Sequence, residues 1–459
     1  NMSAIINNSF RKFQADNFIN SFSSPNNIYL AIGKDSAWAG ASSAQYRETS
    51  PSDITIPIPI DTTAAPFIHH DDFIAAKKIP QSNVSHVIAR YDWVSGTVYR
   101  AYDHLRDDIL ENINPATSTN ENSFYVFTTA FRVYKCISNN NGAVSTIEPT
   151  GAGLGITTGA DGYRWKFMFE VQQADVLKYI TSDWIPVNSP ANSTTQIDQK
   201  NTEDNAVDGS LEQIDVTAGG TGYRTDTGNP QPGNTTTTIV LATTASEDDD
   251  HYNLMRVYIT NGNGLGELKT ISDYVGSTRT ATLTSSWTVT PDTASVYEVM
   301  PAVDITTSTG TIPATARVSS ISGGVIQRVS MVVKGVGYRD AVATVTSGGG
   351  TNAVLASRIG PVGGHGKNAV SELGGAFVML NTRLIGVDGG NFPVNDDFRK
   401  VHLLINPKET TSGNPAATSS TYTASEIEDD SGEIIYTEFR TPINRSSDST
   451  EDIKLVVEF

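Results

Sequence analysis

An internal repeat in the middle of the chain is the feature that most constrains the fold. Residues 209–224, GSLEQIDVTAGGTGYR, align with residues 324–339, GVIQRVSMVVKGVGYR, and both segments end in the pattern G-x-G-Y-R. Each copy predicts a β-strand followed by a tight turn, because glycine permits the bend and the tyrosine ring covers the end of the strand. We therefore expect the centre of the chain to form β-sheet rather than long helices.

The surroundings of the repeat are also typical of β-structure. From residue 208 to residue 360, Thr, Gly and Val dominate and few residues favour helix. Residues 252–299, between the two copies, predict several short strands joined by Asn-Gly and similar turns. We therefore interpret residues 208–360 as an inserted all-β domain that carries a nested module at 252–299. The polar segment 188–207 is the expected linker into this domain, and residues 361–366 are the expected exit.

The two flanking parts of the chain, residues 1–207 and 361–459, are predicted to form one core. Aromatic and polar side chains alternate in GYRWKFMFEV, residues 162–171, which indicates a strand with one buried face. We expect the last strand to tie Phe459 into a sheet. The further strands predicted from apolar runs lie at residues 27–33, 401–406, 432–440 and 453–459.

Helical patterns are few. Phenylalanines recur at roughly helical spacing in residues 8–22, where Asn8 or Ser9 is the expected N-cap. A second short helix is predicted within residues 81–89, just after Pro80. The predicted fold class is thus all-β, a mainly antiparallel β-sandwich core with a few short helices, plus the inserted all-β domain.

Charge and cysteine content exclude several classes of protein. The formal net charge is −18, so the chain lacks the basic surface that nucleic acid or an anionic membrane requires. Cys136 is the single cysteine, which excludes an intrachain disulfide framework and a site with several cysteine ligands. No run approaches the ~18 apolar residues of a membrane span, and the first residues lack the pattern of a signal peptide. We expect no nucleic-acid partner and no membrane insertion.

Two glycine-rich segments resemble phosphate-binding loops without meeting their requirements. NGNGLGEL, residues 261–268, lacks the G-x-G-x-x-G spacing and lies among β-like residues, so we interpret it as a hairpin turn. In the second segment, GGHGK at residues 363–367, Pro361 stands where a P-loop needs its first glycine, and Asn368 stands where it needs Ser or Thr. Neither segment is predicted to bind a nucleotide.

The histidines and acidic clusters do not form a recognisable metal site. None of the seven histidines lies in H-E-x-x-H or H-x-H spacing. His69 to Asp72 are the most metal-like local group, but adjacent strand residues point to opposite faces, so an exposed polar loop is the preferred interpretation. Residues 248–251 and 428–433 lack the spacing of a calcium loop, and we interpret them as solvated loops. No metal and no cofactor is expected.

No catalytic arrangement emerges from the sequence. The nucleophile motif G-x-S-x-G is absent, and Cys136 lies in a strand-like segment where it is expected to pack as a small hydrophobic residue. The aromatic stripe at residues 163–169 is expected to be a buried sheet face rather than a sugar-binding platform. A carboxylate pair of the kind used by glycoside hydrolases stays open, because its spacing depends on the fold. We predict no catalytic residue and expect that the chain is not an enzyme.

Segments at the two ends of the chain form an ordered series. They are FRKFQADNFINSF at 10–22, NIYLAIGKDSAW at 27–38, VIARYDW at 87–93, DGYRWKFMFEV at 161–171, INPKE at 405–409, SGEIIYTEFRTPI at 431–443 and IKLVVEF at 453–459. In order and approximate spacing, the series resembles the baseplate wedge subunits of T-even-type contractile-tailed bacteriophages, the products of gene eight. The resemblance covers residues 9–186 and 361–459. Residues 252–299 separately resemble a small β module common in phage tail proteins.

The resemblance implies an all-β sandwich-like core and a homodimer without enzyme activity. It also implies other baseplate wedge proteins as partners, and a place in the tail baseplate of the virion after assembly in the host cytoplasm. Shorter family members lack a domain such as residues 208–360, so the role of the insertion stays open. The alternative function is that of a carbohydrate-binding tail or receptor-recognition protein that contacts a host-surface glycan through the insertion. A third hypothesis is a glycan hydrolase or lyase.

Overall fold

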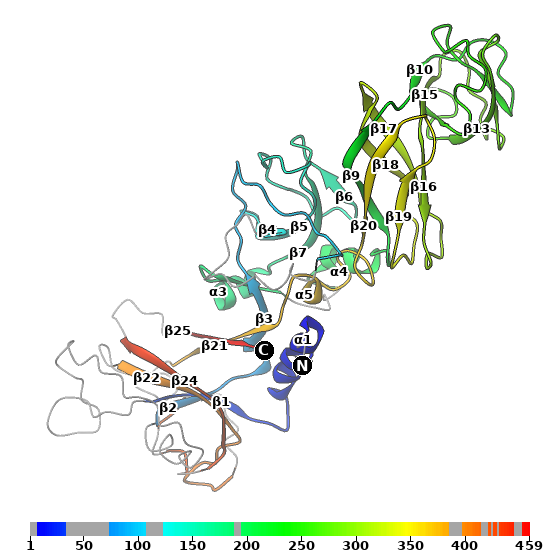
Figure 1. Cartoon of the computed structure of the whole chain (residues 1–459). Coiled ribbons are helices and arrows are strands. Elements are labelled where there is room, and N and C mark those ends of the chain that lie inside the picture. Colours follow the sequence, from blue (N-terminus) through cyan, green and yellow to red (C-terminus); the bar gives the residue numbers. More distant parts are fainter. Residues whose placement is uncertain are drawn as a thin grey trace, which may run out of the picture.

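The computed structural model shows an elongated molecule built mainly of antiparallel β-sheets (Figure 1). Strands dominate and the helices are few and short, which confirms the predicted all-β fold class. Among the described residues, no helix is long and apolar enough to cross a membrane. The structure describes residues 7–33, 73–106, 123–187, 194–384, 397–414, 421–423, 426–428, 431–444 and 452–459.

Two sheets at one end of the molecule are each assembled from both ends of the sequence. Their strand orders are β23-β2-β1-β22-β24 and β25-β21-β3-β8. Leu30 of the first sheet and Leu380 of the second lie in one apolar cluster, so the two sheets share a core. The strands are β1 (Ile28–Gly33), β2 (Phe73–Lys78), β22 (Asp397–Ile405), β23 (Thr421–Thr423), β24 (Glu433–Asn444), β3 (Val84–Ala89), β8 (Trp184–Pro186), β21 (Phe377–Arg383) and β25 (Asp452–Glu458).

Helix α1 (Asn8–Ser21) covers this core, close to the position predicted for it. Its N-cap is Asn7 rather than Asn8 or Ser9, because the Asn7 side chain accepts a hydrogen bond of 2.9 Å from the Phe10 backbone N–H. Only two of the four phenylalanines in the predicted helical pattern pack against the core. Phe18 and Phe22 pack against the core, whereas Phe10 and Phe13 are 48% and 58% exposed.

The helix predicted within residues 81–89 is wrong. Only a 3-10 turn, η1 (Gln81–Asn83), is helical there, and Val84–Ala89 form β3. This strand is buried along its whole length because it pairs with β21 on one side and β8 on the other. The apolar residues that suggested one helical face therefore belong to a fully buried strand. Periodicity alone does not distinguish a fully buried strand from a buried helix.

A second β module occupies the middle of the molecule, with strand order β4-β5-β7-β6 (Figure 1). Contrary to the expected single buried face, both faces of β7 are buried, and Lys166 and Met168 are only 4% and 0% exposed. Met168 is an extra residue in the pairing with β5, so Phe169 packs in a different cluster from Phe167. The elements are β4 (Tyr125–Phe127), β5 (Arg132–Ser138), β6 (Ile156–Thr158), β7 (Arg164–Glu170), α3 (Gln173–Tyr179) and α5 (Ala369–Glu372).

The segment expected to be a linker is partly structured. Residues 188–193 lie outside the described residues, but Ile197–Asp204 form helix α4, which packs against β7. Gln199, Thr202 and Glu203 of this helix are buried. A segment with buried polar side chains is part of the core, so the composition that suggested a linker was misleading here.

Six strands that carry the two copies of the repeat form one domain, which we call the repeat domain. Each copy of the repeat begins a set of three strands. The first set is β9 (Leu211–Thr221), which lies in the first copy, with β16 (Ala302–Thr306) and β17 (Thr315–Ser322); the second set is β18 (Val325–Val333), which lies in the second copy, with β19 (Val342–Val345) and β20 (Thr351–Ile359). They form a four-stranded sheet, β18-β17-β16-β19, and a two-stranded sheet, β20-β9, around one apolar cluster. The first and last strands, β9 and β20, pair with each other, so the chain enters and leaves the domain side by side.

The two copies are arranged reciprocally. The Tyr223 backbone N–H donates to the Gly324 carbonyl over 3.0 Å, and the Tyr338 backbone N–H donates to the Gly209 carbonyl over 2.9 Å. The end of each copy is therefore bonded to the start of the other. Both tyrosines are buried in the same cluster, as expected for rings that cover strand ends.

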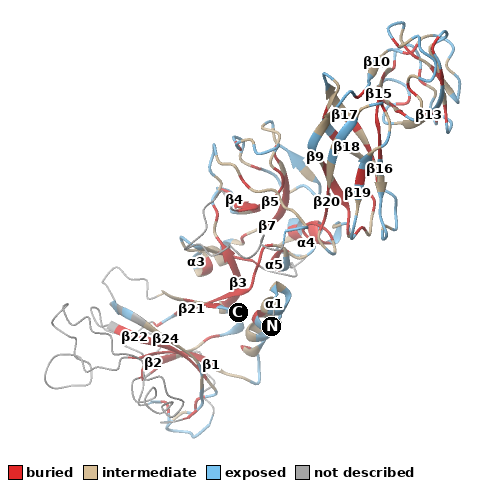
Figure 2. Ribbon diagram, in the orientation of Figure 1, coloured by how far each residue is buried: buried red, intermediate tan, exposed pale blue. Residues whose placement is uncertain are grey.

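Residues 226–300 form a separate unit at the far end of the molecule, which we call the tip module (Figure 1). It contains residues 252–299, but its sheet also includes two earlier strands and encloses a core of its own. Buried residues run along the strands of each module, while the outer loops are exposed (Figure 2). The strands are β10 (Asp226–Gly228), β11 (Thr238–Val240), β12 (Arg256–Asn261), β13 (Leu268–Val275), β14 (Thr280–Leu283) and β15 (Val296–Met300).

Candidate functional site

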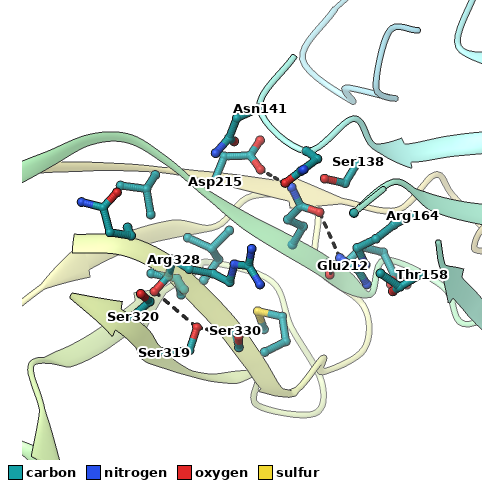
Figure 3. A pocket seen from close by; sticks show the side chains of 18 of the residues that line it. Ser138, Asn141, Thr158, Arg164, Glu212, Asp215, Ser319, Ser320, Arg328 and Ser330 are labelled. Carbon is teal, nitrogen blue, oxygen red and sulfur yellow. Dashed lines mark hydrogen bonds between the residues drawn. The ribbon is translucent and has the colours of Figure 1, made fainter. Parts of the chain in front are cut away.

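A large cleft lies where the middle module meets the repeat domain (Figure 3). Its volume is about 930 Å³, within the range of roughly 300–1,000 Å³ that is usual for ligand sites. We call it the junction cleft. Most of its lining residues are polar or charged: Ser138, Asn140, Asn141, Thr158, Gly162, Arg164, Glu212, Gln213, Ile214, Asp215, Val216, Arg317, Ser319, Ser320, Gln327, Arg328, Val329, Ser330, Met331 and Lys334.

Arg164, from β7, is the principal cation on the wall formed by the middle module. Its Nη1 donates to the Gln213 side-chain oxygen over 3.0 Å and to the Glu212 backbone carbonyl over 3.4 Å. Both acceptors are neutral, and no carboxylate of the described residues forms an ion pair with this guanidinium. Burial lowers the pKa of Arg164, although the negative charges of Glu212 and Asp215 act to raise it.

The opposite wall belongs to the repeat domain. Lys334 pairs with Glu212 over 2.6 Å. Arg317 pairs with Glu298 over 2.6 Å and lies over the Tyr258 ring, with its Cζ 4.0 Å from the ring centroid. Strand β18 also presents Arg328, whose side chain is exposed and makes no ion pair with the described residues (Figure 3). Two guanidinium groups without a carboxylate partner, Arg164 and Arg328, therefore line this cleft.

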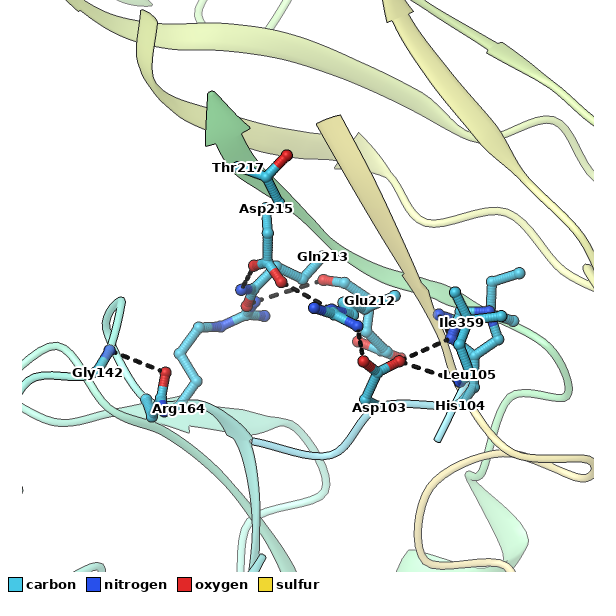
Figure 4. A network of polar contacts seen from close by, with 12 residues as sticks. Asp103, His104, Leu105, Gly142, Arg164, Glu212, Gln213, Asp215, Thr217 and Ile359 are labelled. Atoms are coloured by element: carbon cyan, nitrogen blue, oxygen red, sulfur yellow. Dashed lines mark hydrogen bonds and ion pairs between the residues drawn. The ribbon is translucent and has the colours of Figure 1, made fainter. Parts of the chain in front are cut away.

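Arg358, at the end of β20, ties the repeat domain to the middle module. Figure 4 shows its two acidic partners, Asp103 and Asp215, on either side of the junction. Its guanidinium pairs with Asp215 over 2.7 Å and also with Asp103, which belongs to the middle module. Burial acts to raise the pKa of Asp103, but the Leu105 backbone N–H and Arg358 hold it below its ordinary value. Beside this pair, the Ile359 backbone N–H donates to the His104 ring over 3.4 Å. The carboxylates at the junction are thus already neutralised by cations of the chain itself.

A second group of charges is buried below the junction. The Lys135 ammonium pairs with Glu372 over 2.9 Å and lies 3.9 Å from the centroid of the Tyr102 ring. Glu372 also accepts hydrogen bonds of 3.1 Å from the backbone N–H groups of Gly366 and Asn368. Burial lowers the pKa of Lys135, although Glu372 opposes the shift. This group fixes the loop that leaves the repeat domain against the middle module.

His365 lies in that loop and packs edge-on against Tyr102, with ring centroids 4.9 Å apart. Its Nδ1 is buried without a hydrogen-bond partner among the described residues. Burial lowers the pKa of His365 well below its ordinary value, and the positive charges of Lys135 and Lys166 reinforce the shift. The imidazole is therefore neutral at physiological pH.

The two residue groups considered for catalysis or sugar stacking are buried. Tyr163, Trp165 and Phe167 lie inside the middle module, which confirms that the aromatic stripe is a buried sheet face and not a sugar platform. Cys136 is buried in β5, and burial raises the pKa of its thiol, which confirms that it packs as a hydrophobic residue.

The glycine-rich segments also have structural roles. NGNGLGEL connects β12 and β13, which pair antiparallel, so the predicted hairpin is confirmed. In GGHGK, the Gly363 N–H that a phosphate would need donates instead to the Asp208 carboxylate over 2.7 Å. A negative side chain at this position disfavours an anion there.

Only some of the candidate metal ligands lie in the part of the chain that the structure describes. His69 to Asp72 lie outside the described residues, as do Asp429 and Asp430 of the acidic segment 428–433. Asp248 lies in an exposed loop, 3.7 Å from the His251 ring. Within the part of the chain that the structure describes, no group of three or more His, Cys, Asp or Glu side chains is placed to hold a metal ion.

The sequence did not indicate the junction cleft, because its residues come from distant segments. Arg164 follows the expected alternation of a strand, and Arg328 lies within the second copy of the repeat. Glu212 and Asp215 both line the cleft, as a hydrolase would require of two carboxylates. Each is held by a cation, however, Glu212 by Lys334 and Asp215 by Arg358. That pairing fits poorly with the roles of acid and nucleophile.

Comparison with known proteins gives a family match at the C-terminal end of the chain. No curated protein sequence matches the chain. The matched part contains β21, β22, β24 and β25, which belong to the two sheets at the end of the molecule opposite the tip module. Over residues 372–459, the chain matches the family model described as Bacteriophage T4, Gp8, and this match supports its relation to phage baseplate proteins.

Proposed function

We propose that this protein is a structural subunit of the baseplate wedge of a contractile phage tail. The family match at residues 372–459 is the observation that carries the proposal. The matched strands do not form a unit by themselves, because β21 pairs with β3 and β22 pairs with β1. Residues far toward the N-terminus complete both sheets. This pairing supports the extension of the resemblance to residues 9–186.

In this proposal the subunit acts as a homodimer and contacts other wedge proteins during tail assembly. Strand β24 supports such contacts because, among the described strands, it is the outermost of its sheet, with β22 as its neighbour. An edge strand offers unpaired backbone donors and acceptors to a second chain. Ile435 and Ile443 on the same strand are exposed. Two copies of one edge related by a two-fold axis would form a self-complementary contact.

Two measurements test the proposal. Light scattering on the purified chain should give a mass of twice 49.2 kDa. Gold-labelled antibody against the repeat domain should bind virions at the end of the tail remote from the capsid. A monomer together with label on another part of the virion would contradict the proposal. The role is structural, so no turnover is expected of the chain, and none of its residues is assigned to catalysis.

The alternative function, glycan recognition through the inserted domain, is favoured by one specific observation. The junction cleft is large and polar, and the inserted domain supplies one of its walls. The ligand class that this cleft fits is a separate question from the baseplate role. The baseplate role does not require that the cleft bind a ligand.

A further inference from the structure

We propose that the junction cleft binds an acidic saccharide, a chain of sugars that bear carboxylate or phosphate groups. The middle module and the repeat domain each supply one wall, so the ligand would contact both (Figure 3). The inference goes beyond the baseplate role and does not depend on it.

The two guanidinium groups without carboxylate partners are the first argument. Arg164 donates only to neutral oxygens of Glu212 and Gln213, although it is largely removed from water. Arg328 stands on the other wall and forms no ion pair with the described residues. A buried cation is normally paired, because desolvation is unfavourable for an isolated charge, and this reason applies to Arg164. Arg328 is exposed and adds a second positive charge on the opposite wall. A ligand carboxylate or phosphate would supply the missing partner, and arginine binds both in a two-pronged geometry.

The local charge is the second argument. The chain as a whole carries −18, yet four cationic and only two anionic side chains line the cleft. Both of the acidic residues, Glu212 and Asp215, are already paired with Lys334 and Arg358. The cleft is therefore a positive region on a negative protein, and low-dielectric walls strengthen its attraction for an anion.

The remaining lining residues favour a saccharide among the possible anions. Hydroxyl and amide side chains occupy both walls, with Ser138, Asn141 and Thr158 on the middle module and Ser319, Ser320, Gln327 and Ser330 on the repeat domain. Such groups match the alternating donors and acceptors of sugar hydroxyls. Peptides gain affinity mainly from apolar pockets and strand edges, which a mostly polar lining does not provide.

Calorimetric titration of the full chain tests the proposal with four probes. The first is a short oligogalacturonate, and the second is its methyl ester, which keeps the sugars but removes the charge. Inorganic phosphate is the third, and polyglutamate is the fourth. We expect the oligogalacturonate to bind, more weakly as salt rises, and the methyl ester to bind at least about tenfold more weakly. Phosphate binding in competition with the oligogalacturonate would identify the anionic group as the main determinant and would support the proposal.

Variants locate the site. Arg328→Gln should weaken oligogalacturonate binding about tenfold or more, and because Arg328 is exposed the fold should be unchanged. Arg164→Gln should have at least the same effect, with thermal melting as a check on folding. Arg279→Gln is the matched control, since Arg279 pairs with Glu247 in the tip module and does not line the cleft. Three results would each overturn the proposal: no binding of the oligogalacturonate, equal binding by Arg328→Gln, or binding of polyglutamate in its place.

Discussion

The two copies of the repeat form equivalent strands and turns, but different connections follow them. After the first copy the whole tip module lies between Arg224 and β16, whereas after the second a short turn joins Arg339 to β19. The strands after these connections nevertheless pair symmetrically, Val303 with Val345 and Thr306 with Val342. The geometry of each copy therefore does not depend on what connects its strands.

This difference shows where such a domain tolerates an insertion. The ends of the tip module are adjacent, since Asp226 pairs with Val299. A connection whose ends already lie side by side can be long, because the entropy of loop closure rises only slowly with length. The turn residues, in contrast, are the same in both copies, because the two turns share one geometry. Three of the predictions below test this contrast between shared turns and different connections, and one tests the junction that carries both copies.

Substitution of the first glycine of either G-x-G-Y turn is expected to have the largest effect. Gly220 and Gly335 have φ of 62° and 68°. A Cβ would collide with the Thr351 carbonyl oxygen in the first copy and would lie 2.7 Å from the Ile312 carbonyl oxygen in the second. Gly220→Ala and Gly335→Ala should each reduce the free energy of unfolding of the repeat domain by roughly 2–5 kcal/mol, as measured by hydrogen exchange of its amides.

Gly323→Ala is the matched control for these variants. Gly323 has a φ of 57° but no atom within 4 Å of its would-be Cβ, so only backbone strain should remain, about 1 kcal/mol. Clearly unequal effects of Gly220→Ala and Gly335→Ala would show that the two turns are not equivalent.

The tyrosines of the two turns should respond differently to loss of the hydroxyl. The Ala314 backbone N–H donates to the Tyr338 hydroxyl over 2.7 Å in a buried site, whereas the Tyr223 hydroxyl has no hydrogen bond to any described residue. Tyr338→Phe leaves a buried donor unsatisfied and should reduce the free energy of unfolding by about 1–3 kcal/mol. Tyr223→Phe should change it by less than ~0.5 kcal/mol. Equal losses in chemical denaturation would contradict this asymmetry.

Acid should weaken the attachment of the repeat domain to the core, independently of both turns. The pKa of His365 lies well below its ordinary value of 6.5 because burial and the charges of Lys135, Lys166, Lys334 and Arg164 disfavour the proton. Below about pH 6.5 the unfolded chain binds a proton at this histidine that the folded chain excludes. The free energy of unfolding is therefore highest above about pH 6.5 and falls as the pH decreases below it.

The pH slope contributed by this histidine is at most about 1.4 kcal/mol per pH unit. His365→Asn should reduce the slope of unfolding free energy against pH below 6.5, as measured by denaturant titration at several pH values. His251→Asn, at a partly exposed histidine of the tip module, is the control. An unchanged slope in His365→Asn would refute the assignment.

Removal of the tip module should have the smallest effect on the rest of the molecule. Replacement of residues 226–299 by an Asn-Gly turn joins two positions that already lie side by side. The change keeps Met300 in the core of the repeat domain and removes two ion pairs, Arg317 with Glu298 and Arg256 with Asp304. Both remaining partners become more exposed to water, so each loss costs up to ~1 kcal/mol. The amides of the repeat domain should therefore be protected from hydrogen exchange nearly as well as in the full chain. Loss of this protection would show that the repeat domain needs the tip module in order to fold.

The sequence predicted those features that depend on local pattern. Alternation and turn residues indicated the strands and the shared G-x-G-Y turns, because glycine with positive φ and a covering tyrosine leave a direct mark on the sequence. The predicted helix at 81–89 failed because pairing of β3 on both sides overrode its periodicity. Helix α4 was missed because its buried polar residues resemble those of a linker.

The junction cleft had no local signal of this kind. Arg164 and Arg328 are far apart in the sequence. They line the same cleft only because the middle module and the repeat domain pack against each other. What distinguishes them is the lack of an acidic partner, a property of the folded molecule. The positions of the other charges, Glu212 with Lys334 and Arg358 with Asp103, were equally invisible in the sequence.

The paired entry and exit strands have a mechanical consequence. β9 and β20 leave the middle module side by side, and the repeat domain and tip module extend from them in line (Figure 1). The outer half of the molecule is thus attached to the middle module at the junction that holds Arg358 and the junction cleft. Because the outer half is long, a small change of angle at this junction would move the tip module through a longer arc, and a molecule bound in the cleft would act directly on the position of the tip.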